Sequence, residues 1–122
     1  MKNLPNADHI TYFDKQICYW QVILGLNSWR LERNPKMSSA MADVQIDHGS
    51  KLAVYRIGNF GGCSIDKESL SLTALHECLH VLLHDLIRTA QNRGSDEDLD
   101  AAEHAVINVL EKVIYGRHNE SI

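Results

Sequence analysis

The sequence predicts an α+β fold in which a small antiparallel or mixed sheet packs on two C-terminal helices. Strand-like patterns fall in the first half of the 122-residue chain, and long helical patterns fall in the second half. A glycine-rich segment at residues 58–64 separates the two halves. Because 44% of the residues are hydrophobic, the chain can bury one core, and we expect a single domain over residues 1–122.

The first half begins with residues 1–16, which we expect to be either helical or irregular. Residues 17–24, ICYWQVIL, are rich in β-branched and aromatic side chains and stop at Gly25, which predicts a strand. The polar stretch at residues 31–39, LERNPKMSS, contains Pro35 and predicts a turn or loop.

A hairpin is predicted next. Residues 41–47, MADVQID, alternate between apolar and polar side chains, as a half-buried strand does. Residues 51–57, KLAVYRI, supply a second strand, and the turn at residues 48–50 makes the pair antiparallel. The following segment, residues 58–64, is expected to be irregular because its glycines are costly in regular structure.

Two helices complete the predicted fold. The first begins after Asp66 or Ser69, either of which can cap a helix N-terminus. It runs to about Gln91, and Gly94 suits the left-handed position that commonly follows a helix end. The last helix is expected over about residues 95–115, with acidic side chains in its first turn and a glycine after its end.

Composition narrows the possible partners. A net charge of -4 and a pI near 5.9 give no electrostatic reason to expect nucleic acid or an anionic membrane as a partner. No apolar run approaches the roughly 18 residues of a membrane span, and the N-terminus lacks a signal-peptide pattern. Cys18, Cys63 and Cys78 are far apart and odd in number, which is typical of reduced thiols. We therefore expect a cytoplasmic protein.

The first of the two helices carries a pattern of metal-binding residues, His76-Glu77-Cys78-Leu79-His80. Residues four apart lie on one helix face, so the imidazoles of His76 and His80 can reach one metal ion. Glu77 is turned by about 100° and can take a proton from a water beside the metal. Zinc is the expected ion because imidazole suits it, although manganese and iron share such ligands.

A catalytic zinc site usually has three protein ligands, so a third is expected outside this pattern. His84 continues the spacing of four. It lies about 12 Å from His76 along a straight helix, however, which is too far for one ion. We expect His84 to line the cleft or to be solvated.

The last helix offers the third ligand. Glu103 falls within the predicted apolar stripe of this helix, where a buried carboxylate must be neutralised or paired. His104 falls beside Glu111 on the predicted solvent-facing side. Glu103 is therefore the expected ligand, and His104 and Asp100 are the alternatives. The predicted apolar stripe consists of Leu99, Val106, Ile107, Leu110, Val113 and Ile114.

The stretches TALHECLHVLLHDL and AAEHAVINVLEKVI resemble the gluzincin metallopeptidases, in which a second helix supplies a glutamate to the metal of an HExxH helix. The chain length resembles the minimal forms that phages and prophages often encode. The resemblance implies a zincin-like fold, zinc ligands at His76, His80 and Glu103, and a general base at Glu77. It also implies that a peptide or protein substrate pairs with a strand beside the cleft, for which residues 51–57 are the expected edge.

The expected function is hydrolysis of a peptide bond, in which zinc acidifies a water and Glu77 takes its proton. The alternative is a zinc-stabilised, non-catalytic binding or structural module, such as a phage component, in which the same ligands hold two helices together. A purely structural site has no need of Glu77, so its presence favours an enzyme. The candidates for stabilising the oxyanion are Tyr55, His84, His104, Tyr115 and Arg88.

Overall fold

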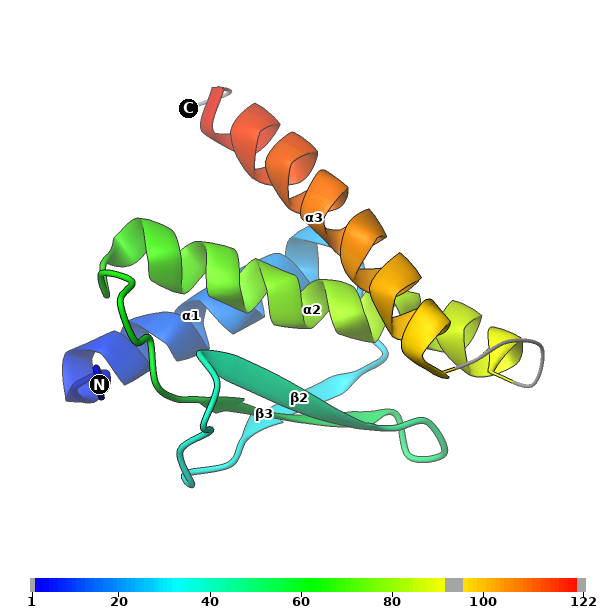
Figure 1. The fold of residues 1–122 in the computed structure, drawn as a ribbon, viewed down its shortest axis with the longest axis horizontal. Helices are drawn as coiled ribbons and strands as arrows, with labels where there is room; N and C mark the ends of the chain where they lie inside the picture. Colours follow the sequence, from blue (N-terminus) through cyan, green and yellow to red (C-terminus); the bar gives the residue numbers. More distant parts are fainter. Residues whose placement is uncertain (1, 92–95, 121–122) are drawn as a thin grey trace.

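The computed structural model describes residues 2–91 and 96–120, which form three helices and a three-stranded sheet (Figure 1). The predicted α+β class, with a small mixed sheet and two C-terminal helices, is confirmed. The elements in chain order are α1 (Ala7–Ile23), β1 (Arg30–Arg33), β2 (Ala42–Asp47), β3 (Leu52–Ile57), α2 (Lys67–Ala90) and α3 (Asp96–Glu120).

The sheet has the strand order β1-β3-β2. As predicted, β2 and β3 form an antiparallel hairpin, with Ala42 opposite Ile57 and Asp47 opposite Leu52. On its other side β3 pairs in parallel with β1. The expectation that residues 51–57 form a free edge is therefore wrong, because β3 is the central strand and β1 and β2 form the two edges.

Residues 17–23 form the end of α1 and not the predicted strand. A capping box starts this helix: Asn6 Oδ1 accepts from His9 N at 2.9 Å, and His9 Nδ1 accepts from Asn6 N at 3.0 Å. The buried side chains recur at the helical period, which outweighs the strand propensity of the individual residues. These side chains are Phe13, Ile17 and Trp20.

The segment predicted as a loop at residues 31–39 contains most of β1. Arg30 N donates to Lys51 O and Asn34 N donates to Tyr55 O, each at 2.9 Å. This strand is short and largely charged, so it shows no alternation of apolar side chains. Its pairing with β3, which is distant in sequence, is what makes it a strand.

The predicted irregular segment after β3 is present, and it begins with a close contact between backbones. Gly58 N donates to Met41 O at 2.8 Å. A Cβ atom at Gly58 would lie 2.1 Å from Ser38 O and 2.4 Å from Ala40 O, so no other residue fits here. This contact fixes the segment that leads into β2.

Helix α2 begins as predicted, with Asp66 as its N-cap. Ser69 N donates to Asp66 Oδ1 at 2.8 Å, and Asp66 N donates to Ser69 Oγ at 3.0 Å. The helix ends within a residue of the predicted Gln91, whereas the predicted Gly94 lies outside the described residues. Helix α3 begins where predicted but continues past Gly116, so its predicted end is wrong. A glycine within a helix costs only about 1 kcal/mol, which the rest of the helix can offset.

Helices α1 and α2 lie side by side over one face of the sheet, and α3 crosses α2 (Figure 1). Trp20 Nε1 donates to Ser71 O and to Ser71 Oγ, each at 3.1 Å, and so ties α1 to α2 within the core. Buried apolar side chains from all three helices and from β3 form one cluster. Among the helices that the structure describes, none is long and apolar enough to cross a membrane.

Candidate metal centre

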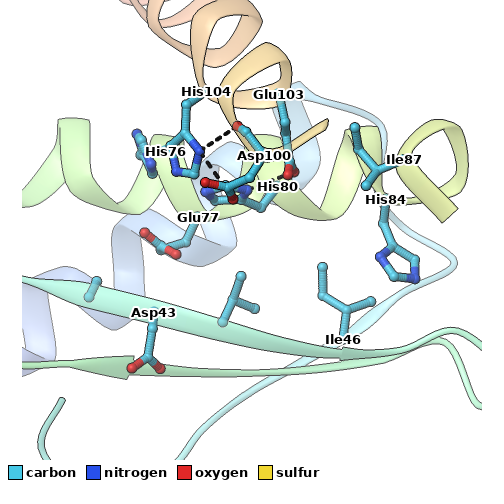
Figure 2. Close-up of a pocket in the computed structure, with 12 residues that line it drawn as sticks. Asp43, Ile46, His76, Glu77, His80, His84, Ile87, Asp100, Glu103 and His104 are labelled. Carbon is cyan, nitrogen blue, oxygen red and sulfur yellow. Dashed lines mark hydrogen bonds and ion pairs between the residues drawn. The ribbon is translucent and has the colours of Figure 1, made fainter. Parts of the chain in front are cut away.

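Three histidines meet where α3 crosses α2 (Figure 2). His76 and His80 project from α2, and His104 projects from α3. The ring centroids lie 5.0 Å apart for His76 and His80, 4.8 Å for His80 and His104, and 5.7 Å for His76 and His104. One potential ligand atom from each ring lies within 4.8 Å of the other two, and the described residues contain no second such group of ligating side chains.

Two carboxylates of α3 hold the α2 histidines by their Nδ1 atoms. His80 Nδ1 lies 2.7 Å from Glu103 Oε2, and His76 Nδ1 donates to Glu111 Oε1. All four side chains are largely withdrawn from solvent. A carboxylate at Nδ1 fixes the imidazole tautomer in which Nε2 carries a lone pair, as is usual for histidines that bind metals.

The third ring is held in the same way by its own helix. His104 Nδ1 lies 2.9 Å from the carbonyl oxygen of Asp100. Because a carbonyl oxygen only accepts hydrogen bonds, Nδ1 of His104 carries the proton. In all three rings Nδ1 is therefore occupied, and Nε2 is the atom that each can offer to a metal.

The structure places Glu103 beside the histidines and not among them. Its carboxylate binds His80 Nδ1, and His104 completes the cluster instead. The predicted face of α3 is partly wrong, because Ile107 is fully buried while Val106 and Val113 are 47% and 46% exposed. The rotation of α3 about its axis brings His104 toward α2.

Glu111 is the residue that sequence reasoning missed. It was expected on the solvent-facing side of the last helix, yet its carboxylate contacts His76. The sequence spacing does indicate that Glu111 shares a helix face with His104, because the two residues are seven apart, which is about two helical turns. Residues so related lie on the same face, so whichever side His104 takes, Glu111 takes too.

Glu77 lies on the side of α2 that faces β2, beside the histidine cluster (Figure 2). Its side chain is buried, with the residue only 6% exposed. Burial raises the pKa of its carboxyl to about 7, while the nearby His76 lowers that pKa and Asp43 raises it. A carboxyl group with a pKa near neutral pH can take up and release a proton, as a general base must.

A groove runs between β2 and the helices. One cavity, of about 460 Å³, is lined by residues of β2, α2 and α3 and contains the histidine cluster. A second cavity, of about 340 Å³, adjoins it and shares Ala42, His76 and Glu77 with it. Glu77 therefore lies near the middle of a groove that extends in both directions along β2.

The predicted oxyanion donors are dispersed. His84 and His104 line the larger cavity, whereas Tyr55, Tyr115 and Arg88 do not. Tyr55 is buried, and its hydroxyl donates to a carboxylate of α1 at 2.8 Å. Tyr115 packs on the buried tryptophan of α1, with ring centroids 6.0 Å apart, and Arg88 is exposed.

Comparison with known proteins adds no relative. A scan against protein-family models found no match, and searches of curated proteins and of solved structures found none either. The resemblance to gluzincins stays a prediction, and the chemistry of the site is argued from its geometry.

Proposed function

We propose that the protein is a zinc-dependent peptidase in which His76, His80 and His104 hold the metal and Glu77 is the general base. One observation carries the proposal. Three imidazoles with occupied Nδ1 atoms converge beside a buried carboxyl group within an open groove. Three nitrogen ligands with a fourth position left for water or substrate are the usual ligand set of a catalytic zinc.

The charges around the site fit a divalent cation. Glu77, Glu103 and Glu111 all line the groove, while no lysine or arginine is among the described residues that line it. Carboxylates withdrawn from water are costly unless a positive charge compensates them. A separate observation favours His104 over Glu103 as third ligand: the carboxylate of Glu103 is already used to orient His80.

The residues of the chain would divide the reaction between them. Zinc, when bound, would supply a Lewis acid that acidifies water and polarises the carbonyl of a substrate. Glu77 would take the proton from the water and pass it to the departing amine. Glu103 and Glu111 would keep the two α2 imidazoles in their ligating orientation.

The substrate would be an extended peptide added to the edge of the sheet at β2. In an antiparallel pair the backbone groups alternate between pointing toward the partner strand and away from it. Because Met41 O accepts from Gly58 N, the N–H and C=O groups of Ala42, Val44 and Ile46 point away from β3. A peptide can bind to them by strand addition. Since the groove continues on both sides of Glu77, cleavage would fall within a chain and not only at its end.

A Glu77→Gln variant tests this proposal. We expect the wild type and the variant each to bind about one zinc, measured by mass spectrometry, because Glu77 is not a ligand. The wild type should cleave members of a random peptide mixture, and the variant should lose about 10²–10⁴-fold in rate, as expected for a lost general base. Glu68→Gln, at an exposed position of α2, is the matched control. A zinc-loaded wild type that cleaves no faster than Glu77→Gln would contradict the proposal.

A second function is favoured by the contacts between the helices. Both carboxylate–imidazole contacts join α2 to α3, so a metal bound there would tie the two helices together. The protein would then be a zinc-stabilised binding or structural module. Zinc binding with a raised melting temperature but without any peptide cleavage would identify this function.

A further inference from the structure

One end of the groove contains a histidine that the proposed reaction does not use. His84 follows His80 by four residues and therefore lies about 6 Å farther along α2. It is too distant to join the three-histidine cluster, and Ile46 of β2 and Ile87 of α2 line the groove beside it (Figure 2). Its Nε2 atom is buried and has no hydrogen-bond partner among the described residues. A buried nitrogen of this kind is costly while it has no partner, and a bound molecule can supply that partner once the ring turns Nε2 toward the groove.

The ring of His84 packs against two other aromatic rings. It lies nearly perpendicular to the ring of Trp29 at a centroid distance of 6.2 Å, and the ring of His48 lies 5.7 Å away. Burial lowers the pKa of His84, so the imidazole is neutral at neutral pH. It can exchange a hydrogen bond with a bound molecule but offers no full charge.

The position of His84 corresponds to a defined residue of an extended peptide. A strand advances about 3.4 Å per residue, and alternate side chains point to the same face. Two residues therefore advance about 6.8 Å, close to the step of about 6 Å between His80 and His84. A substrate side chain two positions from the scissile bond would enter the end of the groove at His84.

The opposite end of the groove has a different chemistry. Besides His76 and Glu77, it is lined by Met41, Leu72, Thr73 and Glu111, and the Glu111 carboxylate is bound to His76. The Thr73 hydroxyl donates to Ser69 O within α2 at 2.7 Å. That end therefore presents mainly apolar surface. Selection through a hydrogen bond is expected only at the end that contains His84.

We propose that His84, Ile46 and Ile87 form a specificity subsite for a substrate side chain with an apolar body and a hydrogen-bonding tip, of which tyrosine is the best example. The isoleucines contact the body of the side chain, and the imidazole of His84, turned so that Nε2 enters the groove, bonds its tip. This inference rests on the proposed peptidase function and deepens it, because it names the class of substrate.

The test reads binding and cleavage separately. Random short peptides are passed over immobilised, zinc-loaded Glu77→Gln protein, with and without a second substitution, His84→Leu, and the retained peptides are sequenced. The same peptides are digested with the wild type and with His84→Leu. We expect tyrosine to exceed phenylalanine by roughly tenfold at one position, two residues from the cleaved bond, as one neutral hydrogen bond allows. His84→Leu should remove this preference in both readouts, and zinc content should not change.

Two further variants complete the design. His84→Gln keeps a hydrogen-bonding tip and should retain part of the preference, even if His84→Leu fails to fold. Glu68→Gln, at an exposed position near the start of α2 and away from the groove, is the matched control and should keep all of it.

The outcomes separate the inference from the function on which it rests. Peptide cleavage with the same tyrosine preference in wild type and His84→Leu, or with no preference in either, overturns the subsite and leaves the peptidase intact. A His84-dependent enrichment among retained peptides without cleavage by the wild type supports the subsite and overturns the peptidase. No retention and no cleavage overturns both.

Discussion

The two sides of α2 differ in how they are held. Toward α1 the contacts are mainly apolar: Phe13, Ile17 and Trp20 of α1 belong to the same buried cluster as Leu75 and Cys78 of α2. Toward α3 the contacts are imidazole–carboxylate pairs, with Ile107 as the one fully buried apolar side chain that the described part of α3 contributes. Apolar burial needs no ligand, whereas paired buried charges depend on their partners. We therefore expect the α1–α2 interface to stabilise the fold by itself and the α2–α3 interface to respond to metal.

The largest expected effect is a loss of stability when an apolar side chain is removed from the α1–α2 interface. Ile17→Ala should lower the free energy of unfolding by about 2–5 kcal/mol, because Ile17 is fully buried in the core. Urea unfolding measures this loss, which should be the same with and without zinc. Val22→Ala on the same helix is the control, since Val22 is 66% exposed and should change stability by less than about 0.5 kcal/mol. A loss at Ile17 that zinc largely restores would show that the two interfaces are not independent.

The next largest effect is the stabilisation that zinc gives at the α2–α3 interface. Zinc at about 100 times its dissociation constant should stabilise the protein by about 2.7 kcal/mol, provided that it binds only the folded chain. Hydrogen exchange should slow most in α3, because its contacts with α2 include the proposed ligands. Equal slowing in α1 and α3 would show that the metal acts on the whole fold at once.

A smaller effect isolates one orienting carboxylate. Glu111→Gln should weaken zinc binding about 10–100-fold, because the charge that holds Nδ1 of His76 is lost while the imidazole remains. Competition with a chromophoric chelator measures the affinity. Glu97→Gln, in the exposed first turn of α3, should leave it unchanged. Equal affinities for the two variants would mean that Glu111 does not orient a ligand.

The smallest effect lies outside both interfaces of α2. Asp43 accepts a hydrogen bond from Arg56 Nε at 2.8 Å, and this contact lowers the pKa of Asp43 below its ordinary value of 3.8. A lowered pKa in the folded state adds stability above the unfolded-state pKa, and that stability is lost as the pH falls through the folded-state pKa. Asp43→Asn should thus lower the melting temperature by a few degrees at pH 7. The difference from wild type should begin to shrink near pH 4 and vanish at lower pH. A difference independent of pH would assign the effect to packing.

The parts of the fold that were predicted correctly are those with local signals. The hairpin at residues 41–57 shows alternation, and Asp66 is a recognisable cap. Residues 17–23 were misread because their buried face, Phe13, Ile17 and Trp20, begins before the strand-like stretch. The strand β1 is polar and exists through its pairing with β3, which no local pattern reveals.

The site residues also divide into those with a local signal in the sequence and those that depend on contacts between helices. His76, Glu77 and His80 are related by spacing within one helix, which is visible in the sequence. The choice between Glu103 and His104 depends on the rotation of α3, and neighbours on a helix differ by about 100°. Helix α3 has apolar residues on both sides, with Val106, Val109 and Val113 exposed and Ile107 buried, so hydrophobicity alone does not select its inner face. The inner face of α3 is determined instead by its contacts with the polar side chains of α2, His76 and His80.

The measurement that tests the metal centre most directly is zinc affinity for three variants of α3. His104→Ala should weaken binding by more than about 100-fold, beyond the 10–100-fold expected when only an orienting residue is lost. Glu103→Gln should fall within that smaller range, and the exposed Val109→Ala should bind as the wild type does. The opposite order for His104→Ala and Glu103→Gln would make Glu103 the third ligand. A wild type without zinc affinity would contradict the metal centre altogether.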